Sequence, residues 1–411
     1  MSTKNEAMSP SQRYLKLVCQ HIQGIRKDLP QLIAMGEKMA GYLLAGGNIC
    51  TPAVNPFWPP EFGGRAGGLM CIKGRVDNSK DVAYFALNNP RRSDPGKHEE
   101  LQKLIKGKAH LFVIGRREDL GALADHPRIE VCTGGTDPED GLYQYGEFAP
   151  LANVRAFEQL VRGWITTGEM IAACIRAERM PIIWMSVWLE GSVARNASFA
   201  HDEQSNYGEP REYGWSSPLQ FFHRDRFIPP LAPGYVAEQF LVAAELFVDA
   251  LDKQSAILNQ AGQWMAAAFS AQRRIWAVAT GHSHPQVLEL PEKHNYPIAW
   301  GPPVSSIARA IPEDLKKGDV ALHLGYAPIH LKNLESLLKR GVNYIHTTPY
   351  GKRAGMPESK NFLWFDLPWR PADAWVDVPG YSVRLLPSSS TAHTIAYNAI
   401  LCEMAEQLGW K

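Results

Sequence analysis

The chain has 411 residues, of which 45% are hydrophobic and 21% charged, so it can bury a core of ordinary size and divides on length into two or three domains. Its net charge of +1 argues against nucleic acid as a partner, and no apolar run approaches the roughly 20 residues that cross a membrane. Residues 1–11 contain no apolar signal core, and six scattered cysteines form no Cys-x-x-Cys pair, which predicts a reduced, cytoplasmic protein.

Two long amphipathic helices are predicted, because apolar residues recur at spacings of three and four. The first begins near Gln12, should bend or break at Pro30, and ends before a strand at 48–51. The second begins near Val236 and ends at 272–274, before a strand at 275–279. The apolar stripes are Leu15, Val18, Ile22, Ile25, Leu29 and Leu32 in the first helix, and Phe240, Ala243, Phe247, Ala250, Leu258, Ala261, Met265 and Phe269 in the second.

The two helices open a longer internal similarity. Residues 79–83 begin an apolar strand that ends at Leu87, and residues 317–321 begin another that ends at Leu324. Each is followed by a helix and a further strand, at 109–114 and 342–346, and each half closes with a helix that contains Glu-Met. The offset drifts little along these elements, so we predict a tandem duplication; chance similarity between two ordinary α/β domains is the alternative.

Strands that alternate with helices predict parallel sheets covered on both faces. We therefore expect two α/β domains, at 12–198 and 235–411, joined by a connection at 199–234. In such open sheets, ligands bind beyond the carboxyl ends of the strands.

The strand at 275–279 is followed by a polar run that can meet an anion: Thr280, Gly281, His282, Ser283 and His284. A glycine turn before a helix presents backbone N–H groups, and imidazoles can act as acid or base near neutral pH. A structural turn with solvated histidines is the alternative.

A second polar run precedes the last helix: Ser388, Ser389, Ser390 and Thr391. One hydroxyl is expected to cap the helix, but four, with His393 in the first turn, exceed what capping requires. We therefore predict contact with a sugar or phosphate. Thr347, at the end of the predicted strand 342–346, is a further candidate for substrate binding.

Two motifs resemble the sugar isomerase (SIS) domain family. Residues 276–284, with Ala-Thr-Gly-His-Ser-His, are similar to its first strand and loop, and residues 61–68, Glu-Phe-Gly-Gly-Arg-Ala-Gly-Gly, to the E-x-x-x-R-A-G-G that follows. The similarity covers 12–185 and 235–411, with different motifs retained in each half. It implies two flavodoxin-like, doubly wound three-layer α/β/α domains in tandem, of the phosphosugar isomerase or phosphosugar-binding type.

The resemblance implies a sugar-phosphate ligand, no cofactor, no membrane partner and a homodimer formed through the long helices. An isomerase of this family interconverts aldose and ketose through an enediol, so Glu61 is the expected base and His282 or His393 the acid. Arg65 is expected to contact substrate. An ion pair between Glu61 and Arg65, one helical turn on, is the structural alternative.

The phosphate loop departs from the family pattern. The family has a Ser/Thr-rich loop after the strand 320–324, whereas residues 325–330 carry no hydroxyl except that of a tyrosine. The equivalent first-half loop can still bind an anion through Asn88, Asn89, Ser93 and two arginines. A non-catalytic phosphosugar sensor or regulatory binder is therefore the alternative function, and a subunit with vestigial pockets a weaker one.

A metal site is disfavoured. Ligands two residues apart share a face only in a strand, whereas this stretch should turn into helix. The residues weighed for it are His282, His284, Glu289, Glu292 and His294.

Overall fold

The computed structural model describes most of the chain. Among these residues, no helix is long and apolar enough to cross a membrane, and all six cysteines are free thiols. The described residues are 8–55, 58–77, 80–87, 99–107, 109–133, 141–144, 151–199, 221–224, 226–279, 298–300, 311–325, 329, 331–349, 351–352, 354–367 and 372–411.

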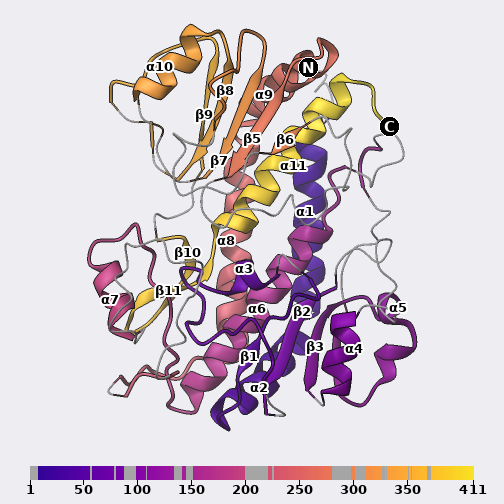
Figure 1. The fold of residues 1–411 in the computed structure, drawn as a ribbon, viewed down its shortest axis with the longest axis vertical. Helices are drawn as coiled ribbons and strands as arrows, with labels where there is room; N and C mark the ends of the chain where they lie inside the picture. The colour runs from indigo at the N-terminus through magenta and orange to yellow at the C-terminus, as the bar shows by residue number, and fades with distance from the viewer. Residues whose placement is uncertain are drawn as a thin grey trace, which may run out of the picture.

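Two sets of strands and helices follow one another along the chain (Figure 1). The first set is α1 (Pro10–Lys27), α2 (Leu29–Leu44), β1 (Ile49–Cys50), α3 (Trp58–Phe62), β2 (Val82–Ala86), α4 (Glu99–Lys106), β3 (His110–Gly115), α5 (Arg117–Leu120), the 3-10 helix η2 (Gly121–Asp125), β4 (Ile129–Thr133), α6 (Arg155–Arg176) and α7 (Ser192–Phe199). The second set is α8 (Tyr235–Asp252), α9 (Ser255–Ser270), β5 (Ile275–Ala279), β6 (Ala299–Trp300), β7 (Val320–Leu324), α10 (Leu331–Lys339), β8 (Asn343–Thr348), β9 (Phe362–Asp366), β10 (Ala374–Val378), β11 (Tyr381–Pro387) and α11 (Ser389–Gln407).

Each set builds one parallel sheet, as predicted. The first has the order β1-β2-β3-β4, and the second the order β6-β5-β7-β8-β9. Lys73 forms a parallel bridge with Cys50 on the side of β1 that faces away from β2. In the second sheet, β6 occupies the equivalent position beside β5. The chain therefore steps to one side of the first strand and then returns to the other side, which is the doubly wound topology.

The antiparallel hairpin of β10 and β11 was not predicted. Ala374 pairs with Pro387 and Val376 with Leu385, outside both parallel sheets. The prediction considered only strands that alternate with helices, whereas β10 and β11 follow each other directly.

The first predicted helix breaks where proline requires it. α1 starts with a capping box, in which Ser9 Oγ accepts the N–H of Gln12 and the Gln12 side chain accepts the N–H of Ser9. α1 ends at Lys27, and Pro30 occupies the first turn of α2, where its missing N–H costs nothing.

Aspartates of similar position lock the start of each sheet. The Asp81 carboxylate accepts the backbone N–H groups of Asn48 at 3.1 Å and Asp77 at 2.9 Å, just ahead of β2. Asp319 accepts the N–H of Arg274, just before β5, at 3.1 Å and the N–H of Lys316 at 2.9 Å. Each carboxylate thereby ties the entry of one strand to the entry of its neighbour.

Glutamates on α6 and α11 cap the starts of other helices. The Glu169 carboxylate accepts the N–H groups of Gly234 at 2.8 Å and Ala237 at 3.0 Å, at the start of α8. Glu403 accepts the N–H of Ser11 at 3.0 Å and its hydroxyl at 2.5 Å, at the start of α1. A carboxylate at these positions satisfies orphan N–H groups and suits the positive end of the helix dipole.

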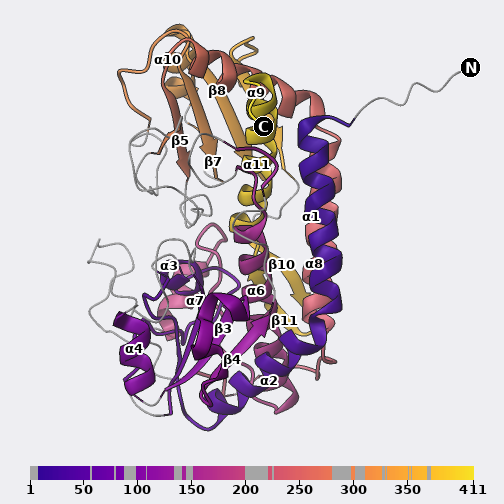
Figure 2. The same cartoon turned by 90° about the vertical axis from the view of Figure 1, so that its right-hand side faces the viewer.

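Long helices join the two sheets, which lie at opposite ends of the molecule (Figures 1 and 2). α1 packs against α11 and α8, and the β10–β11 hairpin packs against α8 and α6 although it belongs to the second half in sequence. The division at 198 and 235 remains a prediction.

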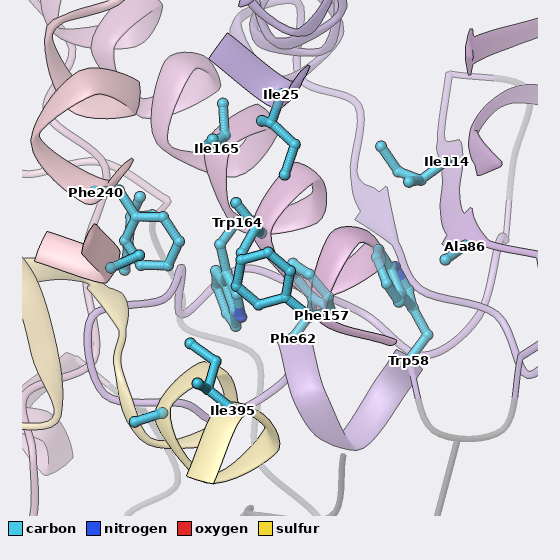
Figure 3. Packing of buried hydrophobic residues seen from close by; sticks show 14 of the residues in the cluster. Ile25, Trp58, Phe62, Ala86, Ile114, Phe157, Trp164, Ile165, Phe240 and Ile395 are labelled. Atoms are coloured by element: carbon cyan, nitrogen blue, oxygen red, sulfur yellow. The ribbon is translucent and has the colours of Figure 1, made fainter. Parts of the chain in front are cut away.

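The core of both halves is continuous. Phe62 stacks on Trp164 with ring centroids 4.2 Å apart, and on Trp58 at the same distance (Figure 3). Phe240 of α8 and Ile395 of α11 belong to the same buried cluster. Elements from both ends of the chain therefore exclude water together.

A glycine allows α9 and α11 to cross closely, which provides a test of this packing. A Cβ on Gly262 would overlap Cβ of Glu403 and lie 2.8 Å from the nitrogen of Met404. Gly262→Ala should lower the free energy of unfolding by about 1–3 kcal/mol through overpacking. Gly24→Ala in α1, where a Cβ meets nothing within 4 Å, is the control and should raise it by up to about 1 kcal/mol. Chemical denaturation measures both, and equal effects would contradict the close crossing.

Candidate functional site

A buried polar cluster lies between the two sheets, where α3 meets the start of α11 (Figure 1). Its centre is the carboxylate of Glu61, in the connection that follows β1. Glu61 Oε2 accepts the hydroxyl of Ser390 at 2.8 Å, and Oε1 accepts the indole N–H of Trp164 at 3.0 Å. The guanidinium of Arg65 lies 3.3 Å from Oε2. α3, α6 and α11 each contribute to this one carboxylate.

Arg65 is fully buried and connects Glu61 to the second half of the chain. Its Nη2 donates to Ser389 Oγ at 2.7 Å and lies 3.6 Å from Asp373 Oδ2. A buried cation requires partners of opposite charge, and here two carboxylates supply them. The ion pair of Glu61 with Arg65, which the sequence offered as the structural alternative to a catalytic role, is present within a larger network.

The start of α11 is occupied by a carboxylate of the protein itself. Asp373 Oδ1 accepts the backbone N–H of Ser389 at 2.9 Å and the hydroxyl of Ser388 at 3.2 Å. Asp373 adopts a left-handed backbone with φ of 50° just before β10. Its negative charge lies where the helix dipole favours an anion.

The Arg-Ala-Gly-Gly motif at 65–68 attaches the segment after α3 to the β10–β11 hairpin. Gly67, with φ of 78°, accepts the N–H of Leu386 at 3.0 Å, and its own N–H donates to Trp184 at 2.8 Å. A Cβ on Gly67 would lie 2.9 Å from Leu386 N, so both the space and the backbone angle require glycine. This docking places Arg65 beside Ser389.

Burial raises the pKa of Glu61 above its usual value of 4.5. The charge of Arg65 and the hydrogen bonds from Trp164 and Ser390 act in the opposite direction without cancelling the effect of burial. A carboxyl group of this kind can take and return a proton closer to neutral pH than an exposed glutamate can.

His393 lies one turn beyond Ser389 on α11 and is fully buried. It is close enough for its charge to help lower the pKa of His323 in β7, to which burial and His346 contribute more. Nδ1 of His323 lies 2.8 Å from Nδ1 of His346, which the Tyr344 hydroxyl also contacts at 2.9 Å. Burial lowers the pKa of His346 to about 3, so this pair is neutral at physiological pH.

Of the predicted site residues that the structure describes, Glu61, Arg65, Ser389 and Ser390 are joined by direct contacts. Ser388 joins them through Asp373. The Thr391 hydroxyl is buried and has no hydrogen-bond partner in the described part of the chain. Thr347, also buried, donates its hydroxyl to the backbone oxygen of His323 at 3.1 Å, within the sheet.

The remaining predicted site residues lie outside the described residues. These are Asn88, Asn89, Ser93, Thr280, Gly281, His282, Ser283 and His284, and the metal cluster weighed at 282–294 lies there too. Among the residues that are described, no group of three or more His, Cys, Asp or Glu side chains is arranged to hold a metal ion.

Two residues of the cluster, Trp164 and Asp373, were not predicted from the sequence. Trp164 lies on α6 one turn after Leu160, within a run of buried residues, and nothing in that spacing separates a hydrogen-bond donor from a core side chain. Asp373 lies 15 residues before Ser388, and only the hairpin between them brings the two together.

Comparison with solved structures identifies the fold. The C-terminal domain of glucosamine-fructose-6-phosphate aminotransferase from Francisella tularensis superposes with a TM-score of 0.51 at 9% identity, over 100% of this chain and 99% of that one. This chain has the α/β fold of the sugar isomerase (SIS) type. The predicted resemblance is thereby confirmed at the level of the fold, across the whole chain.

Two further structures, provisionally assigned as phosphosugar isomerases, match less closely. The protein from Clostridium difficile 630 has a TM-score of 0.47 at 11% identity and covers 96% of this chain and 92% of its own. The protein from Silicibacter pomeroyi DSS-3 has a TM-score of 0.45 at 9% identity, over 98% and 99%. No family model matches this chain, and no curated protein matches it in sequence.

The raised pKa of Glu61 predicts a pH-dependent stability. From pH 4.5 up to its folded-state pKa, the folded protein keeps a proton that the unfolded chain has released, so the free energy of unfolding falls as pH rises through this interval. Glu61→Gln has no such proton. Urea denaturation from pH 4.5 upward should show wild type losing stability relative to the variant, and parallel profiles would contradict the raised pKa.

Proposed function

We propose that this protein binds a sugar phosphate between its two sheets, where α3 meets the first turn of α11, and interconverts its aldose and ketose forms. The observation that carries the proposal is the buried Glu61 carboxyl, held between Arg65, Trp164 and Ser390. Its raised pKa suits a group that exchanges a proton with substrate. The fold shared with an aminotransferase domain that handles a phosphorylated sugar supports the substrate class by analogy alone.

In the proposed reaction, Glu61 removes the proton on the carbon beside the carbonyl and returns it to the neighbouring carbon. His393 or His282 protonates the carbonyl oxygen, which yields the enediol, and takes a proton back in the second step. Arg65 stabilises the negative charge that develops on the enediol. The hydrogen bonds of Trp164 and Ser390 hold the Glu61 carboxyl in one orientation for both steps.

The proposed phosphate contacts are the first turn of α11 and the loops that follow the strands. The buried hydroxyl of Thr391, which lacks a hydrogen-bond partner among the described residues, and the positive end of the α11 dipole both favour an anion. The side chains proposed to complete the site are Asn88, Asn89, Ser93, Thr280, Ser283 and His284, with the backbone N–H of Gly281.

The two halves are further proposed to be tandem copies of one unit. The matching bonds of Asp81 and Asp319, and the matching helix caps of Glu169 and Glu403, support this origin. We propose domains at 12–198 and 235–411 around the connection 199–234, a homodimer formed through the long helices, and a cytoplasmic location in keeping with free thiols.

Replacing the base tests the proposal. Glu61→Gln preserves the shape of the side chain but cannot take a proton, so it should lower kcat for aldose–ketose interconversion by at least about 100-fold. Binding of the sugar phosphate, measured by calorimetry, should stay within a few-fold of wild type. The assay is NMR detection of both isomers across a panel of sugar phosphates.

Glu99→Gln is the matched control, since the Glu99 side chain is 83% exposed at the start of α4. It should leave both turnover and binding unchanged. Wild-type turnover in Glu61→Gln would remove Glu61 from the mechanism, and loss of binding without loss of kcat would assign it to substrate binding alone.

A phosphosugar sensor without turnover is the second candidate. Its supporting observation is that Ser388, Ser389 and Ser390 all hydrogen-bond to protein groups, and that Asp373 fills the start of α11. A ligand would then exchange with Asp373 and change the contacts between the halves. Thermal stabilisation by a sugar phosphate without conversion to its isomer would favour this function, whereas stabilisation with conversion would exclude it.

A further inference from the structure

A groove of about 760 Å³ lies beside the end of α2. We call it the basic groove; its polar and aromatic walls include Glu178, Arg179, Phe222, Arg224, Arg226 and Phe227. Its volume lies in the range of about 300–1,000 Å³ typical of small-molecule sites. None of the residues proposed for the sugar phosphate lines it.

The backbone of the basic groove brings two arginines to opposite positions. Residues 180–182 and 221–223 pair antiparallel, with Pro181 opposite Phe222 and hydrogen bonds of 2.8 and 2.9 Å on either side. Arg179 and Arg224 lie directly beyond the outermost hydrogen-bonded pair, Met180 and His223, and both line the groove. Like charges in such a position destabilise a folded chain unless an anion lies between them.

Further positive charge surrounds this pair. Arg226 follows on the same segment, and it, Arg179 and Arg224 are exposed and form no ion pair with any described residue. Glu178 is the one carboxylate among the described lining residues, and Asp225 lies outside the description. Burial lowers the pKa of nearby Arg195, and the charge of Arg226 acts in the same direction. The described lining of the basic groove therefore has three arginines for one carboxylate.

Aromatic rings line the same walls. The Arg179 guanidinium carbon lies 4.4 Å from the ring centroid of Phe222, which orients the guanidinium over a buried surface. Phe227, directly after Arg226, is 69% exposed. An exposed phenylalanine in a polar groove gains from a flat partner that covers it.

We propose that the basic groove binds a nucleoside diphosphate or triphosphate. The phosphates contact Arg179, Arg224 and Arg226, and the base stacks on Phe227. Guanidiniums match phosphate oxygens in charge and geometry, and aromatic rings accept any base face. A sugar phosphate, which has no aromatic ring, leaves the exposed Phe227 unused.

Calorimetry with ADP and with pyrophosphate separates the two parts of this site. The double variant Arg224→Ala/Arg226→Ala should weaken binding of both ligands by at least about tenfold, because charge-assisted hydrogen bonds are lost. Phe227→Ala should weaken ADP by at least about threefold and leave pyrophosphate unchanged. Arg75→Ala, whose side chain is 86% exposed outside the basic groove, is the control and should alter neither.

Three results would overturn the proposal. The first is no heat of ADP binding at up to about 5 mM ligand. The second is unchanged ADP affinity in the double variant, which would place the ligand elsewhere. The third is equal affinity for ADP and pyrophosphate with no effect of Phe227→Ala, which would show a phosphate site without base recognition. Because all three substituted side chains are exposed, an unchanged melting temperature should accompany each variant.

Discussion

A fully buried guanidinium constrains how this molecule assembles. Arg65 cannot remain charged in the interior without partners, and it finds Glu61 on its own segment and Asp373 and Ser389 from the other end of the chain. The contacts among α3, the hairpin and α11 must therefore form together. Removing either carboxylate would leave an incompletely compensated charge, which ties the geometry of the candidate site to the stability of the core.

The long helices extend this constraint over the whole molecule. α11 begins beside α3 of the first half and ends beside α9 of the second half, and the start of α1 is capped by Glu403 near the far end of α11. The equivalent cap of α8 by Glu169 comes from α6. Each half thus contributes a carboxylate that caps the first turn of a helix in the other half. Neither half satisfies all of its helix N–H groups alone.

The position of Asp373 distinguishes the two candidate functions. At the start of α11, a carboxylate of the protein lies where a bound phosphate would profit from the same dipole and the same N–H groups. Unrelated functions share one fold, so the chemistry of the site is what separates the two candidates.

Local information was enough to predict the parallel α/β sheets, the break at Pro30 and the pairing of Glu61 with Arg65, because periodicity, proline geometry and one helical turn act over a few residues. The hydroxyl run at 388–391 lies in the same polar cluster as Glu61, and its role in binding remains a prediction. Only the tertiary structure brought Trp164 to Glu61 and Asp373 to the start of α11, and only it showed that β11 packs against α6 of the first half. Hydrophobic spacing determines which face of an element is buried, whereas the element that covers it is chosen by packing between residues hundreds of positions apart.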